Sequence, residues 1–249
     1  MTLTDLEMQR YARHLVMPEI GVAGQEKLKR ASVLIIGAGG LGAPAAMYLA
    51  AAGVGTIGVA DADVVELSNL QRQLLHTDAD LGRPKVDSAR DTLTALNGAL
   101  TLHTYHTLVT AENIAALIAP YDFVIDGSDN FETKFLINDA CCAAGKPFSH
   151  AGVLRFGGQV MTVLPGRSPC YRCVFHAPPG ETVPGAKEVG VVGAAAGVIG
   201  SVQALEAIKF LLGAGELLTG RMFTFDALTL KTRIAPLPPR DTHCPACGD

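Results

Sequence analysis

A short apolar run, 33–36, ends in a turn built from four glycines, Gly37, Gly39, Gly40 and Gly42. The residues after the turn, 43–52, are nearly all small or apolar, so we expect a strand, a glycine turn and a buried helix in that order. Backbone N–H groups at a helix start lack partners and carry partial positive charge, which attracts phosphate. The G-x-G-x-x-G spacing of Gly37, Gly39 and Gly42 therefore predicts that the turn binds a nucleotide, without saying which one.

A carboxylate follows the next apolar strand, which we expect over Thr56–Ala60. Asp61 ends that strand roughly twenty residues after the glycine turn, where a carboxylate meets a ribose hydroxyl in such folds. The alternative is a strand-end Asp that is simply solvated. The pair of features suits a dinucleotide and ATP equally, but reaction at a triphosphate needs side-chain cations and Mg²⁺, whereas a nicotinamide cofactor needs little of either.

Two cations occur at suitable places in the chain. Arg72 belongs to the polar segment 68–73, and Lys85 follows Pro84 in the first turn of a helix expected to run to about Leu96. Helix starts favour acidic side chains over basic ones, so Lys85 indicates a strong anion nearby. Either residue alone could be an ordinary surface cation, but together they favour a phosphate-rich ligand.

A second carboxylate follows a third strand, expected over Phe123–Asp126. Asp129 either caps the helix that begins at Asn130 or holds Mg²⁺, and the residues alone favour the cap. Asp61 and Asp129 would both lie at the carboxyl ends of parallel strands, the edge where open α/β sheets bind ligands.

Four of the six cysteines form two CxxC pairs, Cys170 with Cys173 and Cys244 with Cys247. Two such pairs are typical of a tetrahedral four-thiolate Zn²⁺ site, and a site closed by four protein ligands is structural. The long gap between the pairs means that the metal would tie the C-terminal tail to the rest of the fold. The alternatives are two redox pairs or unused thiols, and the remaining cysteines, Cys141 and Cys142, fall in an apolar helix and are expected in the core.

The elements that must position these residues alternate along the first half of the chain. A capping box at Thr4 and Glu7 predicts a first helix over Asp5–His14. Later in this half we expect a strand at Leu100–His106, a helix at Thr110–Ala119 and a helix from Asn130 to about Ala144. Strands that alternate with helices predict a Rossmann-like α/β fold, a parallel sheet with helices on both faces.

The second half of the chain has a different pattern. One long helix is expected at about 198–212, ending at Gly213, among strands without intervening helices: Phe148–Val153, Gln159–Leu164, Met222–Ala227 and Leu230–Ala235. An antiparallel extension of the same sheet fits best. We expect a single domain over 1–249, with a nucleotide-binding half at about 1–146 and a zinc-bearing half at about 147–249, and a Pro- and Gly-rich loop at Ala177–Gly185.

The composition excludes several classes of protein. Hydrophobic residues make up 49% of the chain, charged residues 18%, and the net charge is -4, so we expect no nucleic-acid partner. The N-terminus carries charges where a secretory signal needs an apolar run, and polar residues interrupt the apolar stretch 189–212. We therefore expect no membrane span and a cytoplasmic location.

Taken together, these residues resemble the MoeB/ThiF/HesA adenylyltransferases, bacterial relatives of the ubiquitin-activating enzymes. The resemblance covers essentially the whole chain. The matching features are Arg13 in the N-terminal helix, the GAGGLG turn, Asp61, the SNLQRQ segment, Lys85, the SDN at 128–130, both CxxC pairs and the GVIGSVQALEAIK helix. The SNLQRQ segment together with paired CxxC motifs is specific to this family.

The resemblance implies ATP-dependent activation of the C-terminal glycine of a small ubiquitin-like sulfur carrier protein that ends in Gly-Gly, as an acyl-adenylate with release of pyrophosphate. It implies that Gly40 contacts the nucleotide, Asp61 holds the ribose, and Asn130 lies beside the nucleotide. Arg72 and Lys85 would neutralise the triphosphate and Asp129 would hold Mg²⁺. Arg13 would reach the site of a neighbouring subunit, so the homodimer would be part of the active site. The phosphates would be lined by Ser68, Asn69, Leu70, Gln71 and Arg72.

One departure from the family concerns sulfur. Relatives that bond covalently to their carrier use a cysteine in the loop before the GVIGS helix, but residues 176–190 contain none, and Ala186 stands at the equivalent place. We therefore expect a separate sulfur donor, in molybdopterin, thiamine or related biosynthesis. The alternatives are an NAD-binding oxidoreductase, which leaves Arg72, Lys85 and the CxxC pairs unexplained, and a non-catalytic nucleotide sensor held together by zinc.

Overall fold

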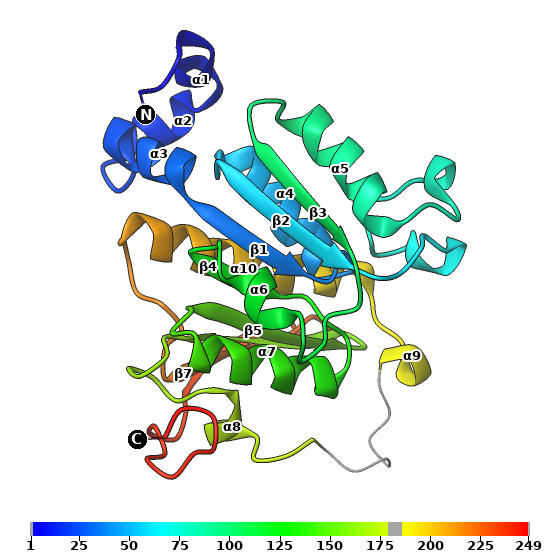
Figure 1. The fold of residues 1–249 in the computed structure, drawn as a ribbon, viewed down its shortest axis with the longest axis vertical. Coiled ribbons are helices and arrows are strands. Elements are labelled where there is room, and N and C mark those ends of the chain that lie inside the picture. Colours follow the sequence, from blue (N-terminus) through cyan, green and yellow to red (C-terminus); the bar gives the residue numbers. More distant parts are fainter. Residues whose placement is uncertain (1, 179–185, 249) are drawn as a thin grey trace.

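An eight-stranded mixed sheet runs through the molecule in the order β3-β2-β1-β4-β5-β6-β7-β8. The computed structural model describes residues 2–178 and 186–248 (Figure 1). The strands are β1 (Ser32–Ile36), β2 (Thr56–Asp61), β3 (Thr101–His106), β4 (Phe123–Asp126), β5 (Phe148–Leu154), β6 (Gly157–Val163), β7 (Arg221–Asp226) and β8 (Lys231–Pro236). Strands β1 to β5 pair in parallel and β5 to β8 pair antiparallel, which confirms the predicted sheet and its extension.

Helices cover both faces of the sheet. The longer ones are α3 (Gly21–Arg30), α4 (Gly42–Ala52), α5 (Lys85–Leu96), α7 (Phe131–Ala143) and α10 (Gly193–Leu212). The shorter ones are α1 (Asp5–Arg10), α2 (Ala12–Leu15), η1 (Leu67–Asn69), η2 (Asp78–Asp80), α6 (Ile114–Ile118), α8 (Tyr171–Val174) and α9 (Ala186–Val189).

Each face of the sheet has its own core. Alternate side chains of β1 point to opposite faces: Val33 and Ile35 pack with α3, α4, α5 and α10, whereas Leu34 and Ile36 pack with α6, α7 and the cysteine segments. Figure 1 shows α6 and α7 in front of the sheet, with α4 and α10 behind it. A parallel sheet covered on both faces has apolar residues at nearly every strand position. This is why the strands in the first half of the sequence can be predicted from their apolar runs.

Helix α10 is a long apolar helix that packs against both the parallel and the antiparallel part of the sheet. By length and composition alone it could span a membrane, yet half of its most apolar stretch is buried within the fold. It packs against α4, β5 and β6, and Ile199 contributes to a separate small core with Leu41 and Val160. Packing between the sheet and α4 therefore accounts for its apolar sequence.

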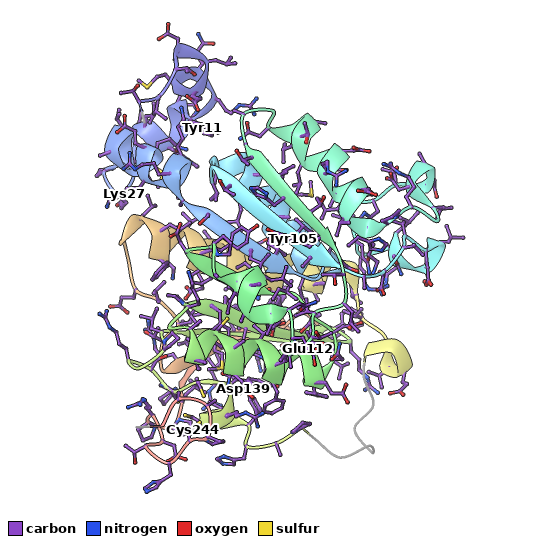
Figure 2. The ribbon with its side chains drawn as sticks, in the orientation of Figure 1. Tyr11, Lys27, Tyr105, Glu112, Asp139 and Cys244 are labelled. Atoms are coloured by element: carbon purple, nitrogen blue, oxygen red, sulfur yellow. The ribbon has the colours of Figure 1, made fainter. Side chains whose placement is uncertain are left out.

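The structure corrects several predicted helix boundaries. The helix expected over Asp5–His14 keeps its predicted capping box but breaks at Tyr11, separating α1 from α2. The phenol of Tyr11, which is labelled in Figure 2, is buried and accepts a hydrogen bond from Asn97 (3.0 Å), so a long-range contact fixes the break. Helix α6 is shorter than Thr110–Ala119, and α10 begins at Gly193, earlier than expected.

Helix α3 is absent from the sequence prediction. Gly21 and Gly24 weaken its helical pattern, because glycine is a poor helix former. At Gly24 a Cβ atom would lie 3.1 Å from Leu212, so the glycine lets α3 approach the end of α10 closely. Lys27 also donates to the carbonyl oxygen of Leu212 (2.9 Å). Tertiary packing therefore stabilises this helix where local propensity does not.

Candidate functional site

A cavity of about 540 Å³ opens where the strand order reverses, between the carboxyl ends of β1 and β4. This switch point is where open α/β sheets bind ligands, and the volume suits a nucleotide-sized molecule. Polar side chains and glycines make up most of its wall, among them Gly37, Gly39, Gly40, Asp61, Asp63, Arg72, Gln73, Lys85, Ser128, Asp129, Asn130, Lys134, Gly152, Gly157 and Gly158.

The four glycines of the turn have different structural roles. Gly37 has a φ of +97°, which favours glycine, and a Cβ there would lie 2.7 Å from the carbonyl oxygen of Gly127. At Gly42 a Cβ would lie 1.8 Å from the carbonyl oxygen of Gly37, so Gly42 closes the turn against the strand. Gly37, Gly39 and Gly40 line the cavity and Gly42 does not. The turn thus presents bare backbone at the start of α4, as a phosphate site requires.

Asp61 lies at the end of β2 and lines the cavity, as its position in the sequence predicts. Its carboxylate accepts from the backbone N–H of Ala38 (2.7 Å) and from that of Asp63 (2.8 Å). It therefore braces the glycine turn as well as facing the cavity. The predicted contact with a ribose stays a prediction.

Five residues of the SNLQRQ segment, 68–72, are predicted to line the phosphates. Of these five, Arg72 reaches the cavity. Its Nη1 donates to the carbonyl oxygen of Ser68 (3.0 Å), and a Cβ at Gly40 would lie 3.4 Å from its Cγ. The structure places the other four outside the lining. Ser68 donates to Glu66, Gln71 donates to the carbonyl oxygen of Val191, Asn69 is buried in η1, and Leu70 follows it.

Gln73 is a lining residue that the sequence analysis missed. Its side chain is buried, and its Oε1 has no hydrogen-bond partner within residues 2–178 and 186–248. Its Nε2 lies 3.8 Å from the position of a Cβ on Gly39. A buried amide oxygen without a partner is costly, so Gln73 offers a bound molecule a hydrogen-bond acceptor beside the glycine turn. The alternation of Gln71, Arg72 and Gln73 in a polar segment is the sequence signal that could have found it.

Lys85 lines the cavity from the first turn of α5, but it does not lie alone. Only 7% of its side chain is exposed, and its Nζ donates to Oδ2 of Asp63 (2.8 Å), which also lines the cavity. The backbone N–H of Lys85 donates to the carbonyl oxygen of Asp63 as well (2.9 Å). Asp63 was missed, although it stands two positions after Asp61. It fixes where the ammonium group points.

The buried side chain of His76 holds the glycine turn in place through hydrogen bonds. One ring nitrogen bonds the carbonyl oxygen of Ala38 (3.1 Å) and the other bonds the hydroxyl of Ser88 on α5 (2.8 Å). Burial lowers the pKa of His76, and the nearby charge of Lys85 acts in the same direction. The ring is therefore neutral at pH 7 and joins the glycine turn to the helix that carries Lys85.

Asn130, and not Asp129, caps helix α7. The side-chain oxygen of Asn130 accepts from the backbone N–H of Thr133 (2.8 Å), so the interpretation of Asp129 as the cap is wrong. The sequence left two adjacent candidates, and the chain direction at the end of β4 decides between them. In the described part of the chain no side chain bonds to the carboxylate of Asp129, which is exposed and lines the cavity. That carboxylate has the oxygen ligands that Mg²⁺ prefers.

The far end of the cavity has little side-chain bulk. Gly152 of β5 and Gly157 and Gly158 of β6 line it, together with the edge of α10. At Gly158 a Cβ would lie 2.4 Å from Ile199, so the glycine also lets the strand lie close to α10. This end can take an extended chain with small side chains, whereas the glycine-turn end, with Arg72 and Lys85, suits phosphates.

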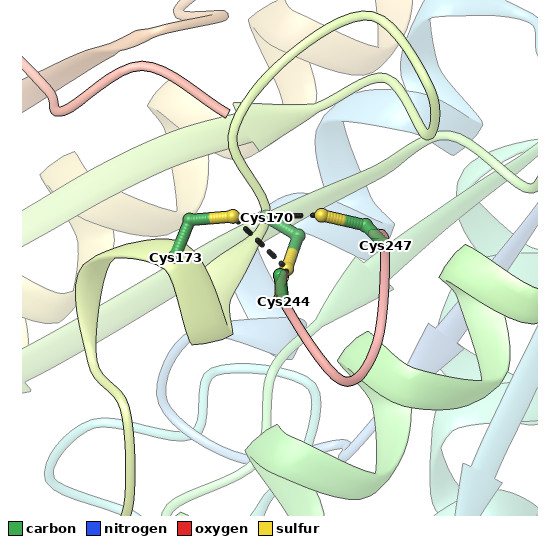
Figure 3. Close-up of side chains that lie close together, drawn as sticks. All are labelled: Cys170, Cys173, Cys244 and Cys247. Carbon is green, nitrogen blue, oxygen red and sulfur yellow. Dashed lines mark hydrogen bonds between the residues drawn. The ribbon is translucent and has the colours of Figure 1, made fainter. Parts of the chain in front are cut away.

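The four cysteines of the CxxC pairs come together away from the cavity. Their sulfur atoms lie within 4.8 Å of one another, at separations that include 3.5, 3.6 and 3.8 Å (Figure 3). A tetrahedral four-thiolate zinc site, with Zn–S bonds of about 2.3 Å, places its sulfurs about 3.8 Å apart. The cluster could therefore hold a metal ion, and the donor set fits Zn²⁺. Burial raises the pKa of Cys244 and of Cys247, so a cation would be needed to keep all four as thiolates.

Surrounding contacts hold this cluster in place. Arg172 makes a two-pronged ion pair with Asp139 of α7 (2.7 Å each), and Arg240 donates to the carbonyl oxygen of Cys247 (2.9 Å). Figure 2 shows Asp139 and Cys244 at the same end of the molecule. Cys141 is buried in α7 as predicted, and Cys142 is half-buried. The ion pair joins α8 to α7, and the C-terminal segment meets α8 at the cysteines.

Arg13 does not line the cavity. It is exposed on α2, near the amino-terminal edge of the strands, whereas the cavity lies at their carboxyl ends (Figure 1). Most of the loop predicted at Ala177–Gly185 lies outside the described residues, and Ala186 begins the short helix α9.

Comparison with known proteins gives a consistent result. Residues 11–246 match the ThiF family. The chain is 48% identical over 248 residues to the "Adenylyltransferase and sulfurtransferase MOCS3" of Culex quinquefasciatus, covering 99% of this chain and 57% of that protein. It is 45% identical over 255 residues to the "Sulfur carrier protein adenylyltransferase" of Thermus thermophilus, covering all of this chain and 94% of that one. The chain thus spans little more than half of the MOCS3 proteins that it matches.

Solved structures share the fold. Escherichia coli MccB crystallised with ATP superposes with a TM-score of 0.84 at 23% identity, covering 98% of this chain and 75% of MccB. MccB crystallised with MccA-N7isoASN gives a TM-score of 0.85 at 23% identity, covering 97% of this chain and 75% of MccB. At this identity the likeness concerns the fold alone.

Proposed function

The chain belongs to the ThiF family, and from that premise we propose that it is an ATP-dependent adenylyltransferase acting on a small ubiquitin-like sulfur carrier protein that ends in Gly-Gly. The observation that carries the proposal is the two-ended cavity. One end presents bare backbone with Arg72 and Lys85, and the other is lined by Gly152, Gly157 and Gly158. A triphosphate suits the first end and a glycine-terminated tail suits the second.

The nucleotide would lie on the glycine turn. Its phosphates would meet the backbone of Gly39 and Gly40 at the start of α4, and its ribose would meet the carboxylate of Asp61. Asn130 lies beside the nucleotide in this arrangement, although its side chain also caps α7. MccB, which shares this fold, has been crystallised with ATP, and that observation supports a nucleotide as the ligand.

The reaction needs no general base. A terminal carboxylate is already ionised at neutral pH, so one of its oxygens can attack the α-phosphorus directly. A bond forms between that oxygen and the α-phosphorus, the bond from the α-phosphorus to the bridging oxygen breaks, and pyrophosphate leaves with the electron pair. Arg72 and Lys85 stabilise the charge that develops on the phosphates, and the cavity walls align the two reactants.

Asp129 is the residue that would hold Mg²⁺, because its carboxylate faces the cavity and bonds to no side chain in the described part of the chain. The ion would supply charge neutralisation on the triphosphate. The cysteine cluster would hold Zn²⁺ as a structural ion, since four protein ligands leave no open position.

The acyl-adenylate would pass to a separate sulfur donor. Residues 176–190 contain no cysteine that could bond to the carrier. A carrier for molybdopterin, thiamine or a related thiolation pathway would serve as substrate. The Thermus relative, named as a sulfur carrier protein adenylyltransferase, supports this substrate class.

ATP–pyrophosphate exchange tests the proposal. Purified carriers ending in Gly-Gly should support incorporation of labelled pyrophosphate into ATP, and the same carriers without their last two residues should not. No exchange with any intact carrier, in the presence of Mg²⁺, would contradict the proposal. Stabilisation against heating by NAD but not by MgATP would favour the oxidoreductase interpretation instead.

A further inference from the structure

Lys134 on α7 lines the cavity but differs from the other cations there. Its side chain is 7% exposed, and its Nζ donates to the carbonyl oxygens of Ser128 (2.8 Å) and Ala151 (2.7 Å). It also lies 3.4 Å from Oδ2 of Asp126. All three donors of the ammonium group are used within the protein, so none is left for a bound phosphate.

The two carbonyl groups belong to opposite walls of the cavity. Ser128 directly precedes Asp129, on the side where the nucleotide is proposed to bind, and Ala151 directly precedes Gly152, on the side proposed for the carrier tail. The parallel ladder between β4 and β5 ends at the pair Asp126 and His150. Beyond that pair the strand pairing ends, and no ladder hydrogen bonds connect the two walls. There Lys134 connects them, because it donates to one carbonyl oxygen on each wall.

The charge of Lys134 is balanced below the cavity. Asp126 is fully buried, and its carboxylate accepts from Nδ1 of His150 (2.7 Å) and from the hydroxyl of Ser128 (2.5 Å). Burial opposes ionisation of Asp126, but the charge of Lys134 and these hydrogen bonds outweigh it and hold its pKa well below its usual range. Burial lowers the pKa of His150, so its ring is neutral at pH 7. The cluster is therefore neutral overall, with one anion and one cation.

We propose that Lys134 is a positioning residue: it fixes the distance between the Ser128–Asn130 loop and the edge of β5, and so holds the two reactants in line. This inference rests on the proposed adenylation and adds to it a residue that touches neither reactant. Because Lys134 acts on alignment, each reactant can still bind when it is lost. Misplacement by about 1 Å can slow a reaction by roughly a hundredfold.

Two variants test the role. Lys134→Met removes the cross-link but leaves Asp126 as a buried charge with less compensation, which destabilises the fold. The double variant Asp126→Asn with Lys134→Met removes both charges and still lacks the cross-link. We expect kcat for pyrophosphate exchange to fall about a hundredfold in both variants, with KM for ATP and for the carrier changed less than about threefold. The number of MgATP sites per subunit, measured by calorimetric titration, corrects kcat for any unfolded fraction.

Lys146, in the loop that follows α7, provides a control with similar hydrogen bonds. Its Nζ also donates to two carbonyl oxygens, those of Ala119 (2.8 Å) and Tyr121 (2.7 Å), at the far end of α7 from the cavity. Lys146→Met removes a similar pair of hydrogen bonds without leaving a buried charge, and it should leave kcat for pyrophosphate exchange at the wild-type value.

Hydrogen exchange provides a readout that needs no activity. Backbone amides of 127–131 and 151–154 should exchange faster in the double variant than in the wild type, and not in Lys146→Met. The inference would be overturned if amide hydrogen exchange at both segments were unchanged in the double variant. It would also be overturned if the kcat for pyrophosphate exchange per MgATP site equalled that of the wild type. Absence of pyrophosphate exchange in the wild type itself would instead contradict the proposed function, and the amide measurement would still decide the role of Lys134.

Discussion

The cations of the cavity fall into two kinds according to what holds them. Lys134 is neutralised by Asp126 beneath the cavity, whereas Lys85 pairs with Asp63, whose side chain is 70% exposed and reaches solvent. An exposed partner is screened by water and gives up its counter-ion more easily than a buried one. Lys85 and Arg72 are therefore the cations available to an incoming phosphate.

Replacement of these two cations tests that distinction. Lys85→Met and Arg72→Ala should each lower the rate of carrier-dependent pyrophosphate exchange by on the order of a hundredfold, since one charge-stabilising group contributes about 3 kcal/mol to a transition state. Arg90→Ala is the control, because Arg90 lies on the exposed face of the same helix as Lys85. Wild-type rates in Lys85→Met or Arg72→Ala would remove that residue from the mechanism.

At the scale of elements, the glycine turn depends on a close contact between α4 and α10. At Gly200 of α10 a Cβ would lie 2.4 Å from the carbonyl oxygen of Leu41, the residue that precedes α4. Glycine at this place lets α10 lie against the start of α4 and fixes the end of the helix that forms the phosphate site. One turn earlier on α10, Gly197 has no heavy atom within 4 Å of its Cβ position.

Two alanine substitutions on α10 should have opposite effects on stability. Gly200→Ala should lower the free energy of unfolding by about 1–3 kcal/mol, because a backbone carbonyl cannot move aside as a flexible side chain can. Gly197→Ala should raise it by up to about 1 kcal/mol, since alanine is the better helix former. Urea denaturation measures both, and equal effects of the two substitutions would contradict the close packing of α10 on α4 as the cause.

At the scale of the whole molecule, Arg13 is on the wrong side of its own subunit for the proposed role. It is exposed on α2, away from the carboxyl ends of the strands that form the cavity (Figure 1). If Arg13 takes part in the reaction, it must act on the cavity of a second copy, which is what the predicted homodimer implies.

Mixing two inactive variants tests this arrangement. Arg13→Ala and Asp129→Ala should each lack exchange activity alone, but a dimer of one with the other contains one intact site. After random re-association of equal amounts, about one quarter of the wild-type sites are complete, so activity should recover toward that value. Recovery no greater than that of either variant alone would show that Arg13 does not act across a dimer.

The sequence alone determined the sheet, the glycine turn and the cysteine cluster, because each depends on residues that are close in the chain or on a strict repeat. Buried parallel strands such as β1 and β4 read as short apolar runs, and the turn follows from glycines within six positions. The spacing within each CxxC pair predicts a metal site, although only the fold brings Cys170 and Cys244 together. Of the predicted site, Asp61, Arg72, Lys85 and Asp129 do meet in one cavity.

Only the tertiary structure decided which polar groups face one another across that cavity. Three features follow from where strands end and how helices approach, which no local pattern encodes. They are Asp63 beside Lys85, the amide oxygen of Gln73 that has no partner in the described part of the chain, and Asn130 rather than Asp129 as the cap. Lys134 is the clearest case, since its partners come from β4 and β5 and meet only because the sheet order places those strands side by side. A sequence repeat reports burial and spacing, whereas a hydrogen bond between distant segments depends on the complete fold.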